Sequence, residues 1–348
     1  MTCSNLPEQN MLYPSTRFMG SKKKLLPHIF EIVNGLDFDT AIDAFSGSGV
    51  VSYMFKTLGK NVIANDHMHM SSTFAKALIE NQNVRLSDSQ VKKLLTRAPK
   101  SDKFVQTTFK DLYFSQKDCA TIDDIRFNLR FIRRSETRSI AMMALIRACM
   151  KRRPRGVFTY TGDRYNDGRS DLLKSIEEHF IDAVSQINNA VFDNGKMNLA
   201  SNSDALSLVQ QKRSLIYLDP PYYTPKSDNQ YVRRYHFVEG LARDWNGVDI
   251  QEHTQTKKFK SYETPFSNRD GALEAFERIF KTFKHSIILV SYSSNALPTL
   301  QEIVKTMSKY KSDVSVVPVN HRYSFGNQGN KIGDNRNAVK EYLFLGQS

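Results

Sequence analysis

The segment from residue 41 to residue 66 limits the possible folds of this chain more than any other. Residues 41–45 (Ala-Ile-Asp-Ala-Phe) predict a buried strand, residues 46–49 (Ser-Gly-Ser-Gly) a tight turn, and residues 50–58 a helix. A second strand is predicted over 61–64, and an acid, Asp66, follows it closely. Strand, turn, helix and strand make a βαβ unit, which implies a parallel sheet. The sequence therefore predicts an α/β protein.

The rest of the chain changes its pattern twice. Further strands are predicted at 197–200, 215–218, 286–292, 314–319 and 341–345, with a helix over 273–283. Helical patterns dominate between the two strand-rich regions, as at 122–150 and 172–191. We therefore expect an α/β part over 1–75, a mainly helical part over 76–190, and a second α/β part over 191–348 with a long polar insertion at 224–270.

The glycine turn has the properties of a ligand-binding loop. Gly47 and Gly49 allow backbone amides to approach a ligand at the start of a helix. Asp66, after the next strand, could accept hydrogen bonds from ribose hydroxyls. The same pattern resembles a dinucleotide fingerprint, with Ser52 at the third glycine position. Asp43 argues against a dinucleotide-binding site, because a carboxylate inside the first strand could face an ammonium group.

The stretch Asp219-Pro220-Pro221-Tyr222 follows the predicted strand at 215–218. A strand in an open α/β sheet carries such an acid to the carboxyl edge, where ligands bind. The Asp219 carboxylate and the Pro220 carbonyl could both accept protons from one amino group, and Tyr222 offers a ring on which a flat base can stack. The alternative is an ordinary strand that ends in a proline-rich turn.

Composition narrows the possible partners. The 348 residues carry a formal net charge of +13, so nucleic acid is the default partner. Cys3, Cys119 and Cys149 are widely spaced and form no CxxC, which argues against a disulfide framework or a zinc site and fits a reducing cytoplasm. His67 and His69 have no further ligand cluster near them in the sequence, so no metal is predicted. A polar start and the lack of a long apolar run predict neither a signal peptide nor a membrane span.

Several short segments occur in the order found in one enzyme family. Residues 18–22 (Phe-Met-Gly-Ser-Lys) resemble its motif X, residues 43–49 its motif I, and residues 65–66 its motif II. Residues 203–205 resemble motif III, and residues 219–222 the catalytic motif IV. The chain thus resembles the DNA adenine methyltransferases of the Dam-like type, in the alpha motif order, over most of its length. Weak motifs in one shared order are more specific than any one of them.

The resemblance implies a fold and a cofactor. The fold would be a Rossmann-like methyltransferase fold, a mostly parallel seven-stranded sheet with helices on both faces, and the helical part would be a target-recognition region. The cofactor would be S-adenosyl-L-methionine. Phe18 and Lys22 would lie at its methionine end, Asp66 would bind the ribose and Asp204 the adenine. The full cofactor-binding set would be Phe18, Met19, Gly20, Lys22, Asp43, Phe45, Gly47, Gly49, Asp66, Asp204 and Asp219.

By the same resemblance, Asp219, Pro220 and Tyr222 would methylate the exocyclic N6 amine of adenine in double-stranded DNA. The base cannot be reached inside the stack, so it would be flipped out. The amino group of cytosine is an alternative substrate, and RNA or a glutamine amide is a weaker one. An inactive DNA-binding protein of the same fold is an alternative from another class, and the intact Asp219 and Tyr222 argue against it.

A basic segment in the helical part is the predicted DNA contact. We expect a basic hairpin or loop there to probe the duplex through Lys151, Arg152, Arg153, Arg155, Tyr160 and Arg164. A monomer on DNA is expected, and a cognate restriction endonuclease is a further candidate partner. The insertion 224–270 could be a second recognition element or a cap on the active site. Its Tyr231 and Tyr235 could be core residues or could stack on bases.

Overall fold

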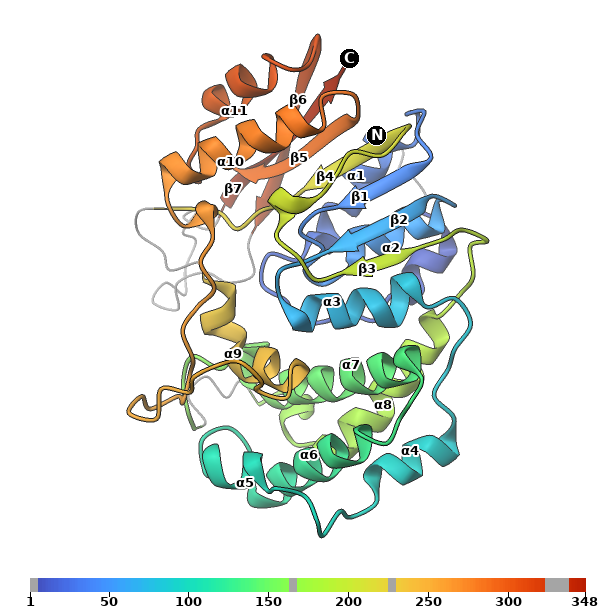
Figure 1. The fold of residues 1–348 in the computed structure, drawn as a ribbon, viewed down its shortest axis with the longest axis vertical. Coiled ribbons are helices and arrows are strands. Elements are labelled where there is room, and N and C mark those ends of the chain that lie inside the picture. The colour runs from blue at the N-terminus through green and yellow to red at the C-terminus, as the bar shows by residue number, and fades with distance from the viewer. Residues whose placement is uncertain (1–5, 163–167, 225–229, 323–337) are drawn as a thin grey trace.

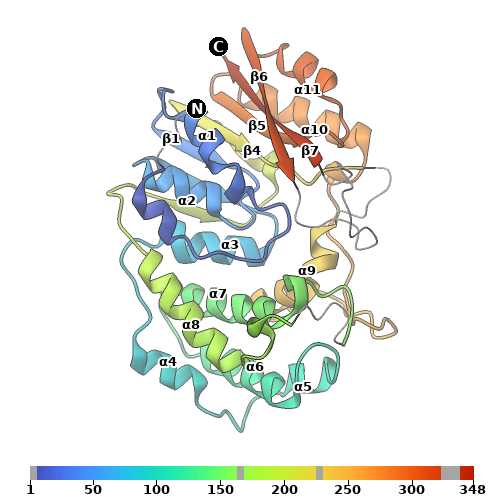
Figure 2. The same ribbon diagram turned by 180° about the vertical axis from the view of Figure 1, so that it is seen from behind.

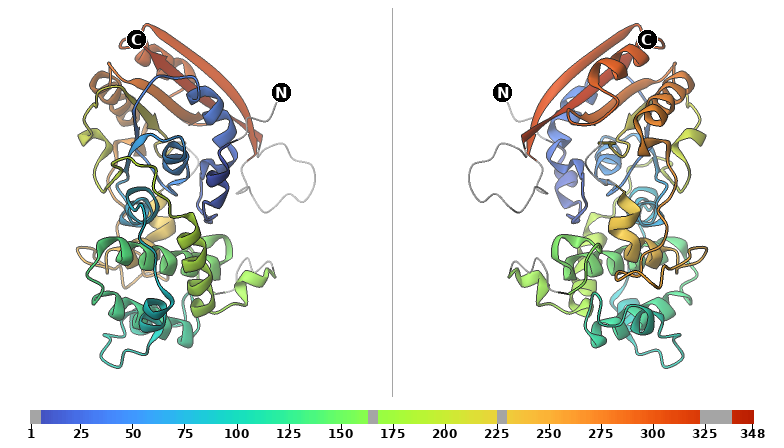
Figure 3. Two further views of the ribbon diagram at one scale, coloured as in Figure 1. Left: turned by 90° about the vertical axis from the view of Figure 1, so that its right-hand side faces the viewer. Right: turned by 90° about the vertical axis from the view of Figure 1, so that its left-hand side faces the viewer.

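The chain folds into an open α/β sheet and a group of helices beside it (Figure 1). The computed structural model describes residues 6–162, 168–224, 230–322 and 338–348. Side views show the helical lobe continuing beyond the sheet, on the side where β3 forms the sheet edge (Figure 3).

The sheet has seven strands in the order β3-β2-β1-β4-β5-β7-β6. They are β1 (Thr40–Asp43), β2 (Asn61–Asn65), β3 (Leu199–Ser201), β4 (Ser214–Leu218), β5 (Ile287–Ser293), β6 (Asp313–Arg322) and β7 (Ala338–Gln347). The first five strands pair in parallel, whereas β7 runs antiparallel to both β5 and β6. The predicted mostly parallel seven-stranded sheet is confirmed. The strand order reverses between β1 and β4, and a crevice is expected at that point, at the carboxyl ends of the strands.

Helices cover both faces of the sheet, as predicted. They are α1 (Leu26–Val33) and α2 (Val50–Thr57) on one face, and α10 (Arg269–Thr282) and α11 (Leu300–Met307) on the other. Figure 2 shows α1 and α2 from the side that faces away in Figure 1. All five side chains of β4 are buried: Leu215 and Tyr217 pack in the core under α1 and α2, and Ile216 and Leu218 in the core under α10. This two-sided burial explains why β4 reads as a continuous apolar run rather than as an alternating pattern.

The helical lobe is built from two separate stretches of the chain. It contains α4 (Asp88–Leu95), α5 (Phe104–Thr108), α6 (Gln116–Leu129), α7 (Ser135–Arg152), α8 (Ile176–Ala190) and α9 (Tyr231–Ala242). Ser87 and Ser175 begin α4 and α8 with capping boxes, in which cap and third helical residue satisfy each other's backbone amides.

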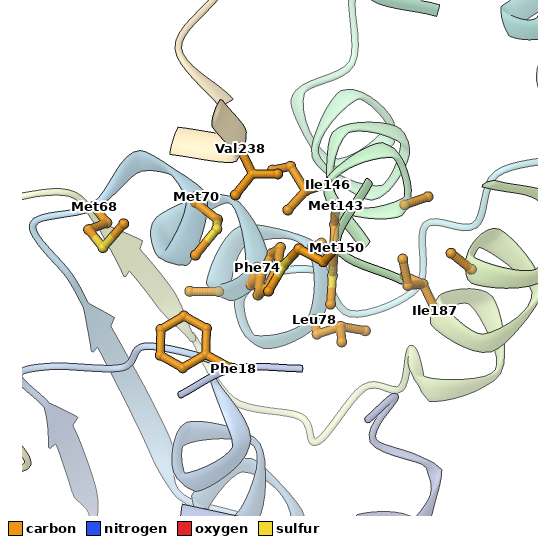
Figure 4. Close-up of a cluster of buried hydrophobic side chains, with 14 of the residues drawn as sticks. Phe18, Met68, Met70, Phe74, Leu78, Met143, Ile146, Met150, Ile187 and Val238 are labelled. Atoms are coloured by element: carbon orange, nitrogen blue, oxygen red, sulfur yellow. The ribbon is translucent and has the colours of Figure 1, made fainter. Parts of the chain in front are cut away.

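Helix α3 (His69–Ala75), prolonged by a π-helical turn (Lys76–Glu80), joins the sheet to the helical lobe. The apolar side chains of Met70 and Phe74 on α3 are fully buried. Figure 4 shows them among side chains from α7, α8 and α9, including Met143, Ile187 and Val238. One hydrophobic core therefore runs from under the sheet into the helical lobe.

The structure refines two expectations about the helical part. The described residues 151–162 contain the end of α7 and a 3-10 turn (Pro154–Gly156) but no strand, so the loop alternative describes them and the hairpin does not. The insertion 224–270, expected within the second α/β part, contains α9, which packs against α3 and α7. The fold of residues 151–162 and the packing of α9 both depend on long-range contacts, which local sequence patterns do not reveal.

Candidate active site

A cavity of about 560 Å³ lies where β1 and β4 end. Most residues of the predicted cofactor and catalytic sets line it. They are Phe18, Met19, Gly20, Lys22, Asp43, Phe45, Gly47, Asp66, Asp204, Asp219 and Tyr222. Gly49 and Pro220 belong to the same two turns but do not themselves line the cavity. The structure thus brings together segments that are up to about 200 residues apart in the sequence, as the crevice rule for α/β sheets predicts.

The glycine turn is shaped by its two left-handed residues. Gly47 has a φ of 49° and Gly49 a φ of 80°. A Cβ on Gly49 would lie 2.8 Å from the Tyr13 hydroxyl oxygen, so a larger residue is disfavoured both by its conformation and by contact. Asp66 ties the turn to the end of β2, because one carboxylate oxygen accepts from the Gly47 N–H at 2.8 Å and the other from the Met68 N–H at 2.8 Å. Burial raises the pKa of Asp66 to about 6, although these two hydrogen bonds act against the rise.

Asp43 is a buried carboxylate at the end of β1. Its Oδ2 accepts a hydrogen bond from the Ser52 hydroxyl at 2.6 Å. Its Oδ1 is buried without a hydrogen-bond partner among the residues that the structure describes. Burial raises the pKa of Asp43 to about 7, and the nearby Asp219 adds to the rise. A buried oxygen without a donor, on a residue that lines a cavity, is suited to a cationic ligand such as an ammonium group.

Asp219 is held by three donors at the end of β4. Its Oδ1 accepts from Lys22 Nζ at 2.8 Å, from the Tyr222 hydroxyl at 3.0 Å and from the Ser291 hydroxyl at 3.1 Å. Lys22 is only 5% exposed, and its Nζ also donates to the Gly20 carbonyl at 3.1 Å. Lys22, expected at the methionine end of the cofactor, forms an ion pair with the carboxylate of Asp219.

Phe18 and two tyrosines of α9 form an aromatic stack at one side of the cavity. The Phe18 ring lies 5.3 Å from the Tyr235 ring and 5.8 Å from the Tyr231 ring, measured between centroids, and is stacked on both. The Tyr235 hydroxyl accepts from the Met19 N–H at 2.7 Å. Of these two tyrosines, Tyr235 is fully buried and Tyr231 lines the cavity. Their spacing of four residues on a helix was the available signal, because it places both side chains on one helical face.

Asp204 lines the cavity, and Asn65 supports the segment that carries it. The exposed Asp204 accepts a hydrogen bond from the Leu206 N–H at 2.9 Å, so it caps a short 3-10 turn while it lines the cavity. Asn65 is fully buried, and its amide donates to the carbonyls of Ala44 at 3.1 Å and Ser203 at 3.0 Å. Asn65 thereby holds the segment that carries Asp204 against the end of β1.

The basic residues at the end of α7 divide into two groups. Arg153 is only 3% exposed and donates to the carbonyls of Tyr160 at 2.8 Å and Gly162 at 3.2 Å. This burial contradicts the expectation that Arg153 contacts DNA; its guanidinium holds the following loop in place. Lys151, Arg152 and Arg155 are half-buried at the surface, although Arg152 also pairs with Asp118 at 3.4 Å.

The other two residues of the predicted DNA-binding set have different outcomes. The Tyr160 hydroxyl donates to the Pro154 carbonyl at 2.7 Å, so this side chain folds back on its own loop. Arg164 lies outside the described residues.

Two negative findings apply to the described part of the chain. Within it, no group of three or more histidine, cysteine, aspartate or glutamate side chains could hold a metal ion. Among the helices described there, none is long and apolar enough to cross a membrane.

Comparison with known proteins identifies the family. Residues 18–296 match the model of the D12 class N6 adenine-specific DNA methyltransferases. The type II methyltransferase M2.HphI of Haemophilus parahaemolyticus is 28% identical over 97% of this chain and 98% of its own length. The type II methyltransferase M.NlaIII of Neisseria lactamica is 23% identical over 94% of this chain and 98% of its own. The modification methylase StsI of Streptococcus sanguinis is 24% identical over 85% of this chain but only 47% of its own length. The family model covers most of the chain, which therefore belongs to the D12 class of N6 adenine-specific DNA methyltransferases.

Proposed function

We propose that the cavity between the ends of β1 and β4 binds S-adenosyl-L-methionine beside a flipped adenine from double-stranded DNA. One observation carries this assignment: Asp43, with its buried and unpartnered Oδ1, and Asp219, with Tyr222, line the same cavity. A cation site and an amine site in one cavity are what transfer of a methyl group between the two ligands requires. The family is specific for N6 of adenine, which excludes the amino group of cytosine and the amide alternatives.

The donor side of the cavity fits the methionine portion of S-adenosyl-L-methionine. Asp43 Oδ1 would accept from its ammonium group, which removes the cost of leaving that oxygen unpaired. Asp66, bonded to the Gly47 N–H, and the exposed Asp204 would accept from the ribose and the adenine. The bound molecule would supply an electrophilic methyl group. The protein's contribution is to place that group in line with the amine.

The acceptor side is formed by the turn after β4. Asp219 and the Pro220 carbonyl would each accept one N–H of the adenine amine, which turns the nitrogen lone pair out of conjugation with the ring. Tyr222 would stack on the flipped base. No strong base is needed, because holding two reactants in the correct orientation can supply roughly 7–11 kcal/mol of the barrier.

The end of α7 would meet DNA near the cavity. The Arg17 guanidinium donates to the carbonyls of Lys151 at 3.0 Å and Arg153 at 3.1 Å, so the end of α7 is tied to the residue that precedes Phe18. Lys151, with Arg152 and Arg155, would contact phosphates there. The net charge of +13 suits a polyanion.

The relatives suggest the biological setting. Two are named type II methyltransferases and one a modification methylase. We infer that this chain likewise modifies a specific DNA sequence as the partner of a restriction endonuclease, and that it acts as a monomer on the duplex.

The test is expression in a host that lacks adenine methylation, followed by long-read sequencing that detects modified bases. We expect N6-methyladenine in one sequence context with the intact chain and none with Asp219→Ala. Asp313→Ala, at an exposed position on β6, is the matched control and should methylate as the intact chain does. Absence of modified adenine with the intact chain refutes the proposal.

A further inference from the structure

Strand β7 carries a carboxylate at a position where the sheet otherwise buries apolar groups. Glu341 is fully buried, as is Leu343 two residues further along the same face. A buried carboxylate is costly unless it is hydrogen-bonded, so a strand is not expected to carry one without a use for it. Because β7 runs antiparallel to β5, its first residues lie at the edge of the sheet where β5 ends, and Glu341 is opposite Ser293 there.

This placement brings Glu341 to the turn after β4 that contains Asp219 and Tyr222. The Tyr222 hydroxyl lies 3.2 Å from Glu341 Oε2 and 3.0 Å from Asp219 Oδ1. A phenol has one proton to donate. The two carboxylates therefore share a single donor, and Tyr222 can be held by either of them.

The sharing matters because Asp219 Oδ1 is crowded. Besides Tyr222, it accepts from Lys22 and from the Ser291 hydroxyl. A carboxylate oxygen has about two lone-pair directions, so three donors already exceed its best geometry. An amine N–H that approaches Oδ1 must displace a donor, and Tyr222 has a second acceptor within reach.

We propose that Glu341 is a positioning residue that takes over the Tyr222 hydroxyl when the adenine amine binds Asp219, and so fixes the Tyr222 ring against the flipped base. This inference rests on the proposed function. Only hydrogen bonds are exchanged: the phenol proton stays on Tyr222, and Asp219 Oδ1 loses one of its three donors, so that it can accept from the amine. The Tyr222 ring also contacts Tyr292, whose centroid is 4.9 Å away at an interplanar angle of 72°.

The test replaces Glu341 by glutamine, which keeps its size but removes the charge. Single-turnover methyl transfer should slow roughly 10- to 100-fold, as expected for a misaligned reactant. The affinity for S-adenosyl-L-methionine should stay within about twofold, because Glu341 does not line the cavity. With 2-aminopurine at the target position, fluorescence of the flipped base should rise, since stacking on Tyr222 quenches it. Glu177→Gln, at an exposed position on α8, is the matched control.

Coupling to Tyr222 separates positioning from a general structural role. In a Tyr222→Phe background the hydroxyl is gone, so Glu341→Gln should cause no further loss of rate. An equal loss in both backgrounds overturns the inference, as does a normal rate in the single variant. If thermal unfolding shows that Glu341→Gln does not fold, Tyr222→Phe tests the same contact: raised 2-aminopurine emission supports the inference and unchanged emission overturns it. Intact protein that methylates no adenine refutes the proposed function instead, which distinguishes the two failures.

Discussion

Replacing Asp43 by asparagine should stabilise the ligand-free protein at alkaline pH while it weakens binding of S-adenosyl-L-methionine. Burial raises the pKa of Asp43 from 3.8 to about 7, so the folded state binds this proton more tightly than the unfolded chain does. A group of this kind contributes stability below pH 4 that is lost as the pH rises through 7. At about 1.36 kcal/mol per pH unit, the ionised side chain costs the folded state up to roughly 4 kcal/mol.

Asparagine is neutral and nearly isosteric, and its side-chain oxygen can keep the bond from Ser52. At pH 8 the variant should therefore unfold at a higher temperature than the intact chain, by up to roughly 4 kcal/mol in free energy of unfolding. Near pH 4 the difference should vanish, because Asp43 is then protonated in the folded state. Binding should change in the opposite sense, since removing one partner of a buried charge pair costs roughly 2–5 kcal/mol, or about 30-fold or more in Kd.

The assays are thermal unfolding of the ligand-free protein between pH 4 and pH 8 and calorimetric titration with S-adenosyl-L-methionine at pH 8. Asp313→Asn, at an exposed position on β6, controls for the loss of one negative charge. Two results would refute the reasoning. A difference in unfolding temperature that does not grow with pH would show that Asp43 is not strained by burial, and an unchanged Kd would show that its Oδ1 does not face the ammonium group.

Three further substitutions separate structural from DNA-binding residues. Gly49→Ala should lower the free energy of unfolding by roughly 1–3 kcal/mol, because alanine is strained at a φ of 80° and its Cβ would meet the Tyr13 hydroxyl. Chemical denaturation measures this loss, and an unchanged denaturation midpoint contradicts the prediction. Arg153→Met should destabilise the fold by roughly 1–3 kcal/mol, since the Tyr160 and Gly162 carbonyls lose their donor. A variant that is as stable as the intact chain but binds DNA more weakly would show instead that Arg153 contacts DNA. Lys151→Ala should leave the unfolding temperature unchanged and reduce the slope of log Kd against log salt for duplex DNA by about 1. An unchanged slope would show that Lys151 does not contact a DNA phosphate.

The sheet and the cavity could be predicted because their signals are local. Strands buried on both faces read as apolar runs, and β4 is an example in which all five side chains are buried. The glycine turn and the turn at Asp219 each lie directly after such a strand. The carboxyl ends of parallel strands meet at one edge, so their separate positions in the sequence converge without further information.

The contributions of distant elements could not be predicted in this way. Arg153 looks like its basic neighbours in the sequence, and only the fold shows that it is buried among backbone carbonyls. Glu341 lies in a strand whose position was predicted, but nothing local indicates that an antiparallel β7 brings it to Tyr222. The insertion 224–270 has a polar composition, and nothing local indicates that its helix α9 carries a buried face.

Helix α9 joins the helical lobe to the cavity, because its Tyr231 and Val232 line that cavity. Its Glu239 is fully buried and accepts from the backbone N–H groups of His69 and Met70, each at 2.9 Å, at the start of α3. Although burial alone would raise the pKa of Glu239, its hydrogen bonds with His69, Tyr262 and these amides lower it, so the carboxylate stays charged. Tyr235 of the same helix binds the Met19 N–H at one wall of the cavity. Because both links are buried, Met19 and the start of α3 are fixed to the same helix, which joins the helical lobe to the cavity proposed for the methyl donor.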